Sequence, residues 1–245
     1  YNDPRFDDDR DFILSSMQEN NVGYILNAGC SVKSSGDSIA IAEKYDFIYS
    51  SAGVHPIYTE GICAEDYDTV KKLSAHSKVK AIGEIGLDYF RKPDDREVQK
   101  AAFDTQIDIA REVNLPFIIH CRDACKDVLD ILKAKGAGKD ALWHCFSESV
   151  ETARIILNMG LTIAVGGTVT FKNNVRTVEA VRYIPLENLV IETDCPYLAP
   201  TPHRGERNSS LNIHLVAQKI AEIKGISFEE VEEITTANAK KFFNI

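Results

Sequence analysis

The chain has 245 residues, of which 44% are hydrophobic and 27% are charged, and its formal net charge is −9 at pH 7. This composition is ordinary for a globular protein, and no apolar stretch is long enough to form a transmembrane helix. The negative charge argues against a general nucleic-acid binder, because lysine and arginine supply most of the affinity for phosphate. It does not exclude an enzyme that acts on phosphate esters, where bound cations supply the local positive field.

The cysteines indicate the compartment. There are six of them, with no CxxC pair and no signal-peptide pattern ahead of them, which favours a reducing environment. We therefore expect a cytoplasmic protein, or a nuclear one in a eukaryote. No membrane association and no obligatory protein partner are evident from the sequence.

Seven short apolar runs, rich in β-branched or aromatic residues and bounded by glycine or proline, have the pattern of strands covered on both faces. In chain order these predicted strands are 24–29, 47–53, 79–84, 116–120, 141–144, 161–166 and 189–194. Segments with helical spacing of apolar residues are 97–113, 124–134, 150–159, 211–223 and 228–243. The alternation of strand and helix predicts a parallel sheet of the α/β class.

We predict one domain over residues 1–245 with the (β/α)8 architecture of a TIM-type barrel, which typically needs about 250 residues. The seven runs are one fewer than the eight strands of a closed barrel. We expect the first strand of the barrel to lie upstream of Tyr1.

Four of the predicted strands end in a residue that can bind a metal: Glu84, His120, His144 and Asp194. Parallel strands present their carboxyl ends at one edge, so we expect these four side chains to converge. Mixed nitrogen and oxygen ligands suit Zn, Mn or Mg. A bound divalent cation lowers the pKa of its water towards about 7, so this set predicts a hydrolytic metal site.

A cysteine directly follows three of the four residues. Side chains alternate along a strand, so we expect Cys121, Cys145 and Cys195 to point towards the helices and not to bind the metal. Three further residues near strand ends are candidates for binding a substrate phosphate: His55, Arg122 and Arg204. The two arginines suit bidentate phosphate contacts.

Five motifs occur in order along the chain: Gly53-Val-His-Pro56, Gly83-Glu-Ile-Gly-Leu-Asp-Tyr89, Ile118-Ile-His-Cys-Arg122, His144-Cys-Phe-Ser147 and Glu192-Thr-Asp-Cys-Pro-Tyr-Leu-Ala-Pro200. Together they resemble the TatD family of metal-dependent deoxyribonucleases, within the amidohydrolase-like barrels. The resemblance implies a (β/α)8 barrel, one to three divalent metal ions and hydrolysis of phosphodiester bonds in DNA, often as an exonuclease.

The resemblance also implies roles for the four candidate ligands. Glu84 would bridge two metals, and His120 and His144 would bind the second one. Asp194 would bind the first and accept the proton of the metal-activated water, so Glu84 and Asp194 are the predicted catalytic residues.

Two departures from the family pattern leave alternatives open. The family opens with a His-x-His motif that the 245 residues do not contain, and without it the barrel would be non-catalytic. Glu148, Ser209 and Ser210 replace residues that are usual in the family, which affects the expected substrate more than the reaction. The net negative charge and the few candidate phosphate ligands favour an alternative function, an amidohydrolase that cleaves a C–N or ester bond in a small molecule.

Overall fold

The structure is a computed structural model that describes all of residues 1–245, and the chain forms two compact units. The middle unit comprises Asn2 and Tyr24–Trp143, and the terminal unit comprises Tyr1, Asp3–Gly23 and His144–Ile245. None of the helices combines the length and the apolarity needed to span a bilayer. The single domain expected from the sequence stays a prediction.

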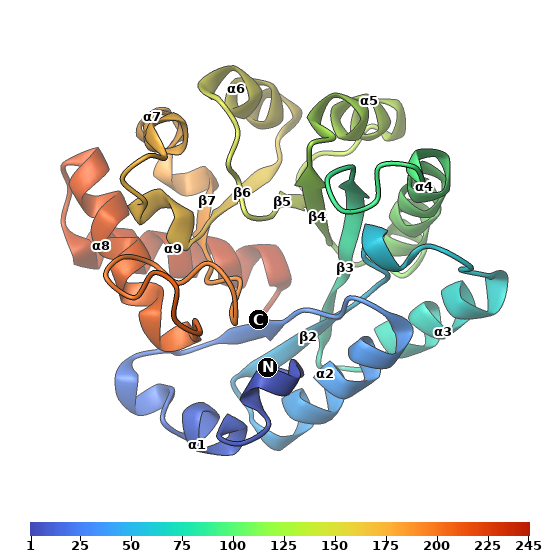
Figure 1. The fold of residues 1–245 in the computed structure, drawn as a ribbon, viewed down its shortest axis with the longest axis horizontal. Coiled ribbons are helices and arrows are strands. Elements are labelled where there is room, and N and C mark those ends of the chain that lie inside the picture. The colour runs from blue at the N-terminus through green and yellow to red at the C-terminus, as the bar shows by residue number, and fades with distance from the viewer. The chain divides into compact units, whose positions relative to one another are not determined.

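The middle unit contains five parallel strands that are hydrogen-bonded in chain order. They are β1 (Ile25–Asn27), β2 (Ile48–Ala52), β3 (Val79–Asp88), β4 (Phe117–Arg122) and β5 (Ala141–Trp143). A helix follows each of the first four strands (Figure 1): α2 (Val32–Lys44), α3 (Ala64–Ser74), α4 (Arg96–Glu112) and α5 (Cys125–Lys135). A short 3-10 helix, η3 (Pro56–Tyr58), also follows β2. Since all five strands run in the same direction, their carboxyl ends lie along one edge.

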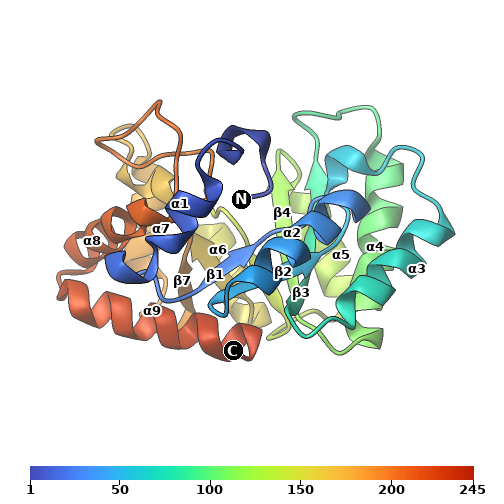
Figure 2. The same ribbon diagram turned by 90° about the horizontal axis from the view of Figure 1, so that it is seen from below.

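The terminal unit contains the parallel pair β6 (Thr162–Val165) and β7 (Leu189–Ile191). Its helices are α1 (Arg10–Ser15), α6 (Val150–Met159), α7 (Val175–Tyr183), α8 (Ile213–Lys224) and α9 (Phe228–Phe243). Its 3-10 helices are η1 (Pro4–Phe6), η2 (Gln18–Asn20), η4 (Gly167–Thr170), η5 (Leu186–Asn188) and η6 (Ser210–Asn212). The last two helices, α8 and α9, pack against each other, as Figures 1 and 2 show.

Strand β3 lies in the interior of the middle unit. Its Ile82, Ile85 and Leu87 are fully buried, and each such side chain contributes about 1.5–3 kcal/mol through burial. Gly86 interrupts these residues at φ +141°, and a Cβ there would lie 2.0 Å from the carbonyl oxygen of His120. Glycine therefore allows β3 to approach β4 closely at the position of a predicted metal ligand.

All seven predicted strands are present, and the repeat of parallel strand and helix is that of TIM-barrel-like α/β proteins. Two strands extend beyond the predicted ends, since β3 reaches Asp88 and β4 reaches Arg122. The five predicted helices correspond to α4, α5, α6, α8 and α9, whereas α2, α3 and α7 were not predicted. The closed eight-stranded barrel stays a prediction.

Candidate metal centre

Three predicted site residues meet in the middle unit. His55 follows β2, Glu84 lies in β3 and His120 lies in β4, and the ligand atoms of the three side chains are all within 4.8 Å of one another. Nε2 of His55 is 3.9 Å from Oε2 of Glu84, and the centroids of the two imidazole rings are 4.2 Å apart. The structure thus brings two nitrogen donors and one carboxylate together from β3, β4 and the segment that follows β2.

Backbone contacts fix the position of Glu84. The Ser51 hydroxyl donates a hydrogen bond to the carbonyl of Gly83 and accepts one from the N–H of Gly29, at 2.7 and 3.1 Å. The N–H of Glu84 in turn donates to the carbonyl of Gly29 at 2.8 Å. A Cβ on Gly53 would lie 2.9 Å from the nitrogen of Gly83, so the end of β2 can come this close to β3 only because residue 53 has no side chain.

The residue before His55 is held by a buried glutamine of α4. The side-chain amide of Gln106 accepts a hydrogen bond from the N–H of Val54 at 2.8 Å and donates one to its carbonyl at 3.0 Å. Nδ1 of His55 accepts a hydrogen bond from the N–H of Ile57 at 3.2 Å. Since Nδ1 accepts this hydrogen bond, Nε2, which lies 3.9 Å from Glu84, is the ring nitrogen that would bind a cation.

Asp88, the last residue of β3, is a functional candidate that the sequence reasoning missed. It is fully buried, and its Oδ2 lies 3.2 Å from Nε2 of His120. Burial opposes its ionisation, but the hydrogen bond with His120 and the N–H of Arg91 outweigh this and lower the pKa of Asp88 to about 2. A carboxylate on the imidazole orients the ring and raises its basicity as a ligand. The sequence did contain a signal for Asp88. Side chains alternate between the two faces of a strand, so Asp88, four residues after Glu84, is expected on the same face as Glu84.

The other predicted ligands, His144 and Asp194, lie together in the terminal unit. Nε2 of His144 is 3.9 Å from Oδ1 of Asp194, and its Nδ1 is 2.7 Å from Oε2 of Glu192. The second oxygen of Glu192 accepts the N–H of Cys145 at 2.9 Å. Glu192 was also missed from the sequence, although it lies two residues before Asp194 in a motif that pointed to this site.

The backbone leaves the strand conformation at these positions. Asp194 has φ +54° and Cys145 has φ +47°, both in the left-handed region that non-glycine residues rarely adopt. Strand alternation does not apply there, and Sγ of Cys145 lies within 4.8 Å of the ligand atoms of His144 and Glu192. The expectation that Cys145 points away from the ligands is therefore wrong.

The two arginines predicted to bind phosphate are both exposed and both lie on aromatic rings. The guanidinium carbon of Arg122 is 4.0 Å from the ring centre of Phe90 in the middle unit. That of Arg204 is 4.5 Å from the ring centre of Phe171 in the terminal unit. His55, the third predicted phosphate contact, lies instead among the metal-ligand candidates of the middle unit.

The donor sets fit a divalent cation. Each unit offers imidazole nitrogen and carboxylate oxygen at close range, the ligands that Zn and Mn accept in hydrolytic sites, and its carboxylates also suit Mg. Two of the imidazoles are also contacted by a carboxylate that is not among the predicted ligands: Asp88 contacts His120, and Glu192 contacts His144. Metal-binding histidines typically have such a carboxylate partner.

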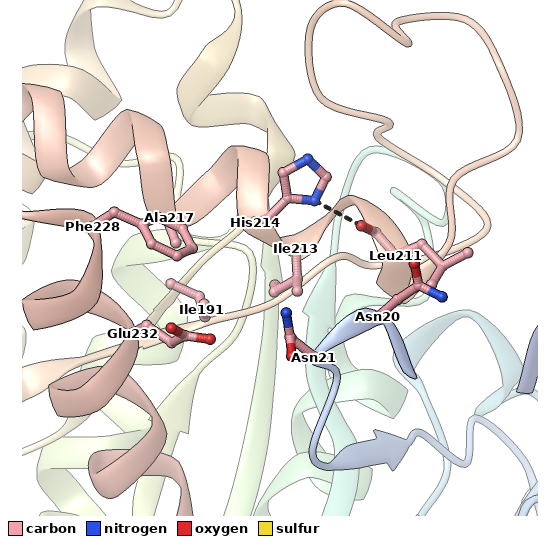
Figure 3. Close-up of a pocket in the computed structure, with 9 residues that line it drawn as sticks. All are labelled: Asn20, Asn21, Ile191, Leu211, Ile213, His214, Ala217, Phe228 and Glu232. Atoms are coloured by element: carbon pink, nitrogen blue, oxygen red, sulfur yellow. Dashed lines mark hydrogen bonds between the residues drawn. The ribbon is translucent and has the colours of Figure 1, made fainter. Parts of the chain in front are cut away.

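A pocket of about 360 Å³ lies elsewhere in the terminal unit (Figure 3). Its wall includes Ile191, Ala217 and Phe228, and His214, whose Nδ1 lies 2.8 Å from the carbonyl of Leu211. None of the predicted site residues lines this pocket, so it is separate from the candidate metal centre.

Comparison with known proteins agrees with these observations. Residues 1–244 match the family described as TatD related DNase. The chain is 43% identical to the uncharacterized metal-dependent hydrolase YabD of Bacillus subtilis (strain 168), covering 100% of this chain and 96% of the relative. It is 32% identical to the 3'-5' ssDNA/RNA exonuclease TatD of Pantoea ananatis (strain LMG 20103), covering 98% of this chain and 95% of the relative.

A solved structure is similar along the whole chain. The crystal structure of YJJV, a TatD homolog from Escherichia coli K12, is 27% identical and has a TM-score of 0.94. The match covers 100% of this chain and 95% of that one.

Proposed function

The chain belongs to the TatD-related DNase family of metal-dependent hydrolases, and we propose that it hydrolyses phosphodiester bonds in DNA, removing nucleotides from a strand end. The observation that carries this proposal is the close grouping of His55, Glu84 and His120, which come from the segment after β2 and from the neighbouring strands β3 and β4. The name of the Pantoea relative supports the exonuclease form of the activity.

In this proposal Glu84, His120, His144 and Asp194 hold the divalent ions. When bound, the ions supply Lewis acidity, which makes water a nucleophile at neutral pH and stabilises charge on the phosphate. Asp88 and Glu192 hold the imidazoles of His120 and His144 in orientation through contacts of 3.2 and 2.7 Å.

Asp194 acts as the general base. As the oxygen of water forms its bond to phosphorus, one proton of that water passes to the Asp194 carboxylate, and the ester P–O bond breaks. The leaving oxygen then takes up that proton from Asp194, which returns the carboxylate to its ionised form. Asp194 suits this role because its side chain is 30% exposed, so that water reaches it, and it lies 3.9 Å from His144.

Arg122 and Arg204 bind the phosphates of the substrate. Both guanidinium groups are exposed, with the guanidinium carbon 4.0 and 4.5 Å from a ring centre, and an arginine beside an aromatic ring can still make bidentate contacts to phosphate. Such local positive charge is necessary in a chain with a net charge of −9.

The test is a nuclease assay on the full chain loaded with Mg, Mn or Zn. Single-stranded DNA, duplex DNA and RNA labelled at either end are compared with a panel of small amides and esters. We expect progressive shortening of DNA that stops on chelation. Cleavage of an amide by a metal-loaded protein that leaves every nucleic acid intact would instead establish the amidohydrolase alternative.

A pair of variants ties the activity to the metal centre. Glu84→Gln should lower both the bound metal per chain and the rate of DNA cleavage, whereas Glu222→Gln on α8 should change neither. Equal metal content and equal rate in both variants would remove Glu84 from the site.

A further inference from the structure

Phe90 is a large apolar side chain that stays exposed beside the metal-ligand candidates. It follows β3 by two residues, and 60% of its surface is accessible although the Arg122 guanidinium lies 4.0 Å from its ring centre. Arg122 is the last residue of β4 and pairs in register with Asp88 of β3. The ring and the cation are therefore presented together at the carboxyl ends of two adjacent strands.

The loop that carries Phe90 is anchored by buried polar groups. Oδ1 of Asp88 accepts the N–H groups of Phe90 and Arg91 at 3.1 and 2.8 Å. Gln99 of α4, which is fully buried, accepts the N–H of Asp88 and donates to the carbonyls of Asp88 and Lys92, at 2.7, 3.2 and 3.0 Å. Such an anchored loop loses little further entropy when a ligand covers the exposed ring.

The same anchor fixes the distance from the ring to the candidate metal ligands. While one oxygen of Asp88 holds the backbone of Phe90, the other lies 3.2 Å from the imidazole of His120. His120 and Arg122 are two residues apart on one strand, which places them on the same face and roughly 6.6 Å apart. The ring lies beyond Arg122, 4.0 Å from its guanidinium carbon, so a base stacked on it would lie about one nucleotide from a phosphate held at the ligands.

We infer that Phe90, backed by Arg122, is a stacking platform for an unpaired nucleobase of the substrate, an inference that rests on the proposed function. Every base has a π-face, so stacking on an exposed ring recognises single-stranded nucleic acid with little regard to sequence. A base inside a duplex is already stacked and cannot occupy the platform without leaving the helix. The site therefore takes single strands and frayed ends in preference to intact duplex.

The first experiment measures binding without hydrolysis. A fluorescein-labelled oligothymidylate is titrated in EDTA with the wild-type chain and with Phe90→Ala, Phe90→Leu and Phe90→Trp, and anisotropy is recorded. The alanine and leucine variants should bind about 5- to 150-fold more weakly, while tryptophan restores binding. Phe12→Ala, which removes an exposed phenylalanine of α1, is the matched control and should bind as the wild type does.

The second experiment measures turnover with metal on two single-stranded substrates, one with ordinary terminal nucleotides and one with abasic terminal nucleotides. Phe90→Ala should raise KM for the base-bearing substrate and leave the abasic substrate unaffected, because only the first can stack. A variant that merely disturbs the loop would slow both substrates.

The two results separate the platform from the activity. Equal affinity of the wild type and Phe90→Ala, at whatever level, overturns the platform, and so does an equal KM effect on both substrates. A wild type that binds through Phe90 but cleaves neither substrate supports the platform and overturns the nuclease proposal.

Discussion

Oε2 of Glu192 lies 2.7 Å from Nδ1 of His144. The remaining carboxylate oxygen of Glu192 accepts the N–H of Cys145, so Glu192 is itself fixed by the backbone that it contacts. A carboxylate in this position orients the imidazole and makes its other nitrogen a stronger ligand, so that Nε2 is directed towards Asp194 at 3.9 Å.

Replacing Glu192 with Gln should weaken metal binding because the amide keeps the shape but not the charge. We expect about a 10- to 100-fold lower affinity for Zn or Mn, measured by competition with a chelating dye. Glu206→Gln is the matched control, since Glu206 contacts His203 at 3.0 Å in an exposed loop. Unchanged affinity in Glu192→Gln would show that the Glu192 carboxylate does not strengthen metal binding through His144.

Asp194→Asn should abolish most of the turnover while leaving the fold intact. Asparagine cannot accept the proton of the attacking water, and loss of a general base typically costs about 10²- to 10⁴-fold in rate. We expect this fall in kcat on single-stranded DNA, with a circular dichroism spectrum like that of the wild type. Asp130→Asn, in an exposed pair with Lys126, should retain full activity. A near-normal rate in Asp194→Asn would remove this residue from the mechanism.

Gln106→Leu should destabilise the middle unit. The substitution leaves the buried N–H and carbonyl of Val54 without the side-chain partner that each has at 2.8 and 3.0 Å. Each unsatisfied group costs about 1–3 kcal/mol, so the free energy of unfolding should fall by about 2–6 kcal/mol in urea titrations.

The control for this prediction is Gln218→Leu, on an exposed position of α8. Surface substitutions away from such contacts usually change stability by less than about 0.5 kcal/mol. If Gln106→Leu were as stable as Gln218→Leu, the two hydrogen bonds to Val54 would contribute nothing to folding.

The stability of the protein should depend on Tyr89 at alkaline pH. Burial, together with the hydrogen bond that its hydroxyl donates to Asp127 at 2.8 Å, raises the pKa of Tyr89 to about 12 from 10.0. A raised pKa means that the folded state favours the neutral phenol, so this contribution is complete below pH 10 and is lost as the pH rises towards 12.

Urea unfolding at pH 9 and pH 11.5 measures this effect in the wild type and in Tyr89→Phe. The wild type should lose more stability between the two pH values than the variant, because phenylalanine has no proton to lose. An identical loss in both proteins would show that the phenol of Tyr89 titrates alike in the folded and unfolded states.

Much of the fold follows from local pattern. Each of the seven strands is a short β-branched or aromatic run between glycines, prolines or polar residues, a signal contained within a few neighbouring positions. The four predicted metal ligands followed from the same apolar runs, because the type of residue that ends each run is visible in the sequence. The structure brings Glu84 to His120 in one unit and His144 to Asp194 in the other.

The helices that the pattern did not predict have weak amphipathic signals. Helix α2 contains several serines and Gly36, residues of poor helix propensity. Its buried face includes Ser35 and Ser38, whose hydroxyls find partners that only the folded chain supplies, such as Asn27 for Ser38 at 3.0 Å. Helix α3 buries only Val70 and Ser74 and so has almost no apolar stripe.

By itself the sequence determined where the strands lie and which chemical groups stand in or just after them, since side-chain periodicity and residue type are local properties. Only the tertiary structure decided which carboxylate supports which imidazole. Asp88 reaches His120 across 32 residues of chain and Glu192 reaches His144 across 48. A hydrogen bond requires its atoms to be placed to within a few tenths of an ångström, and that depends on how β3 pairs with β4 and on the left-handed backbone at Cys145 and Asp194.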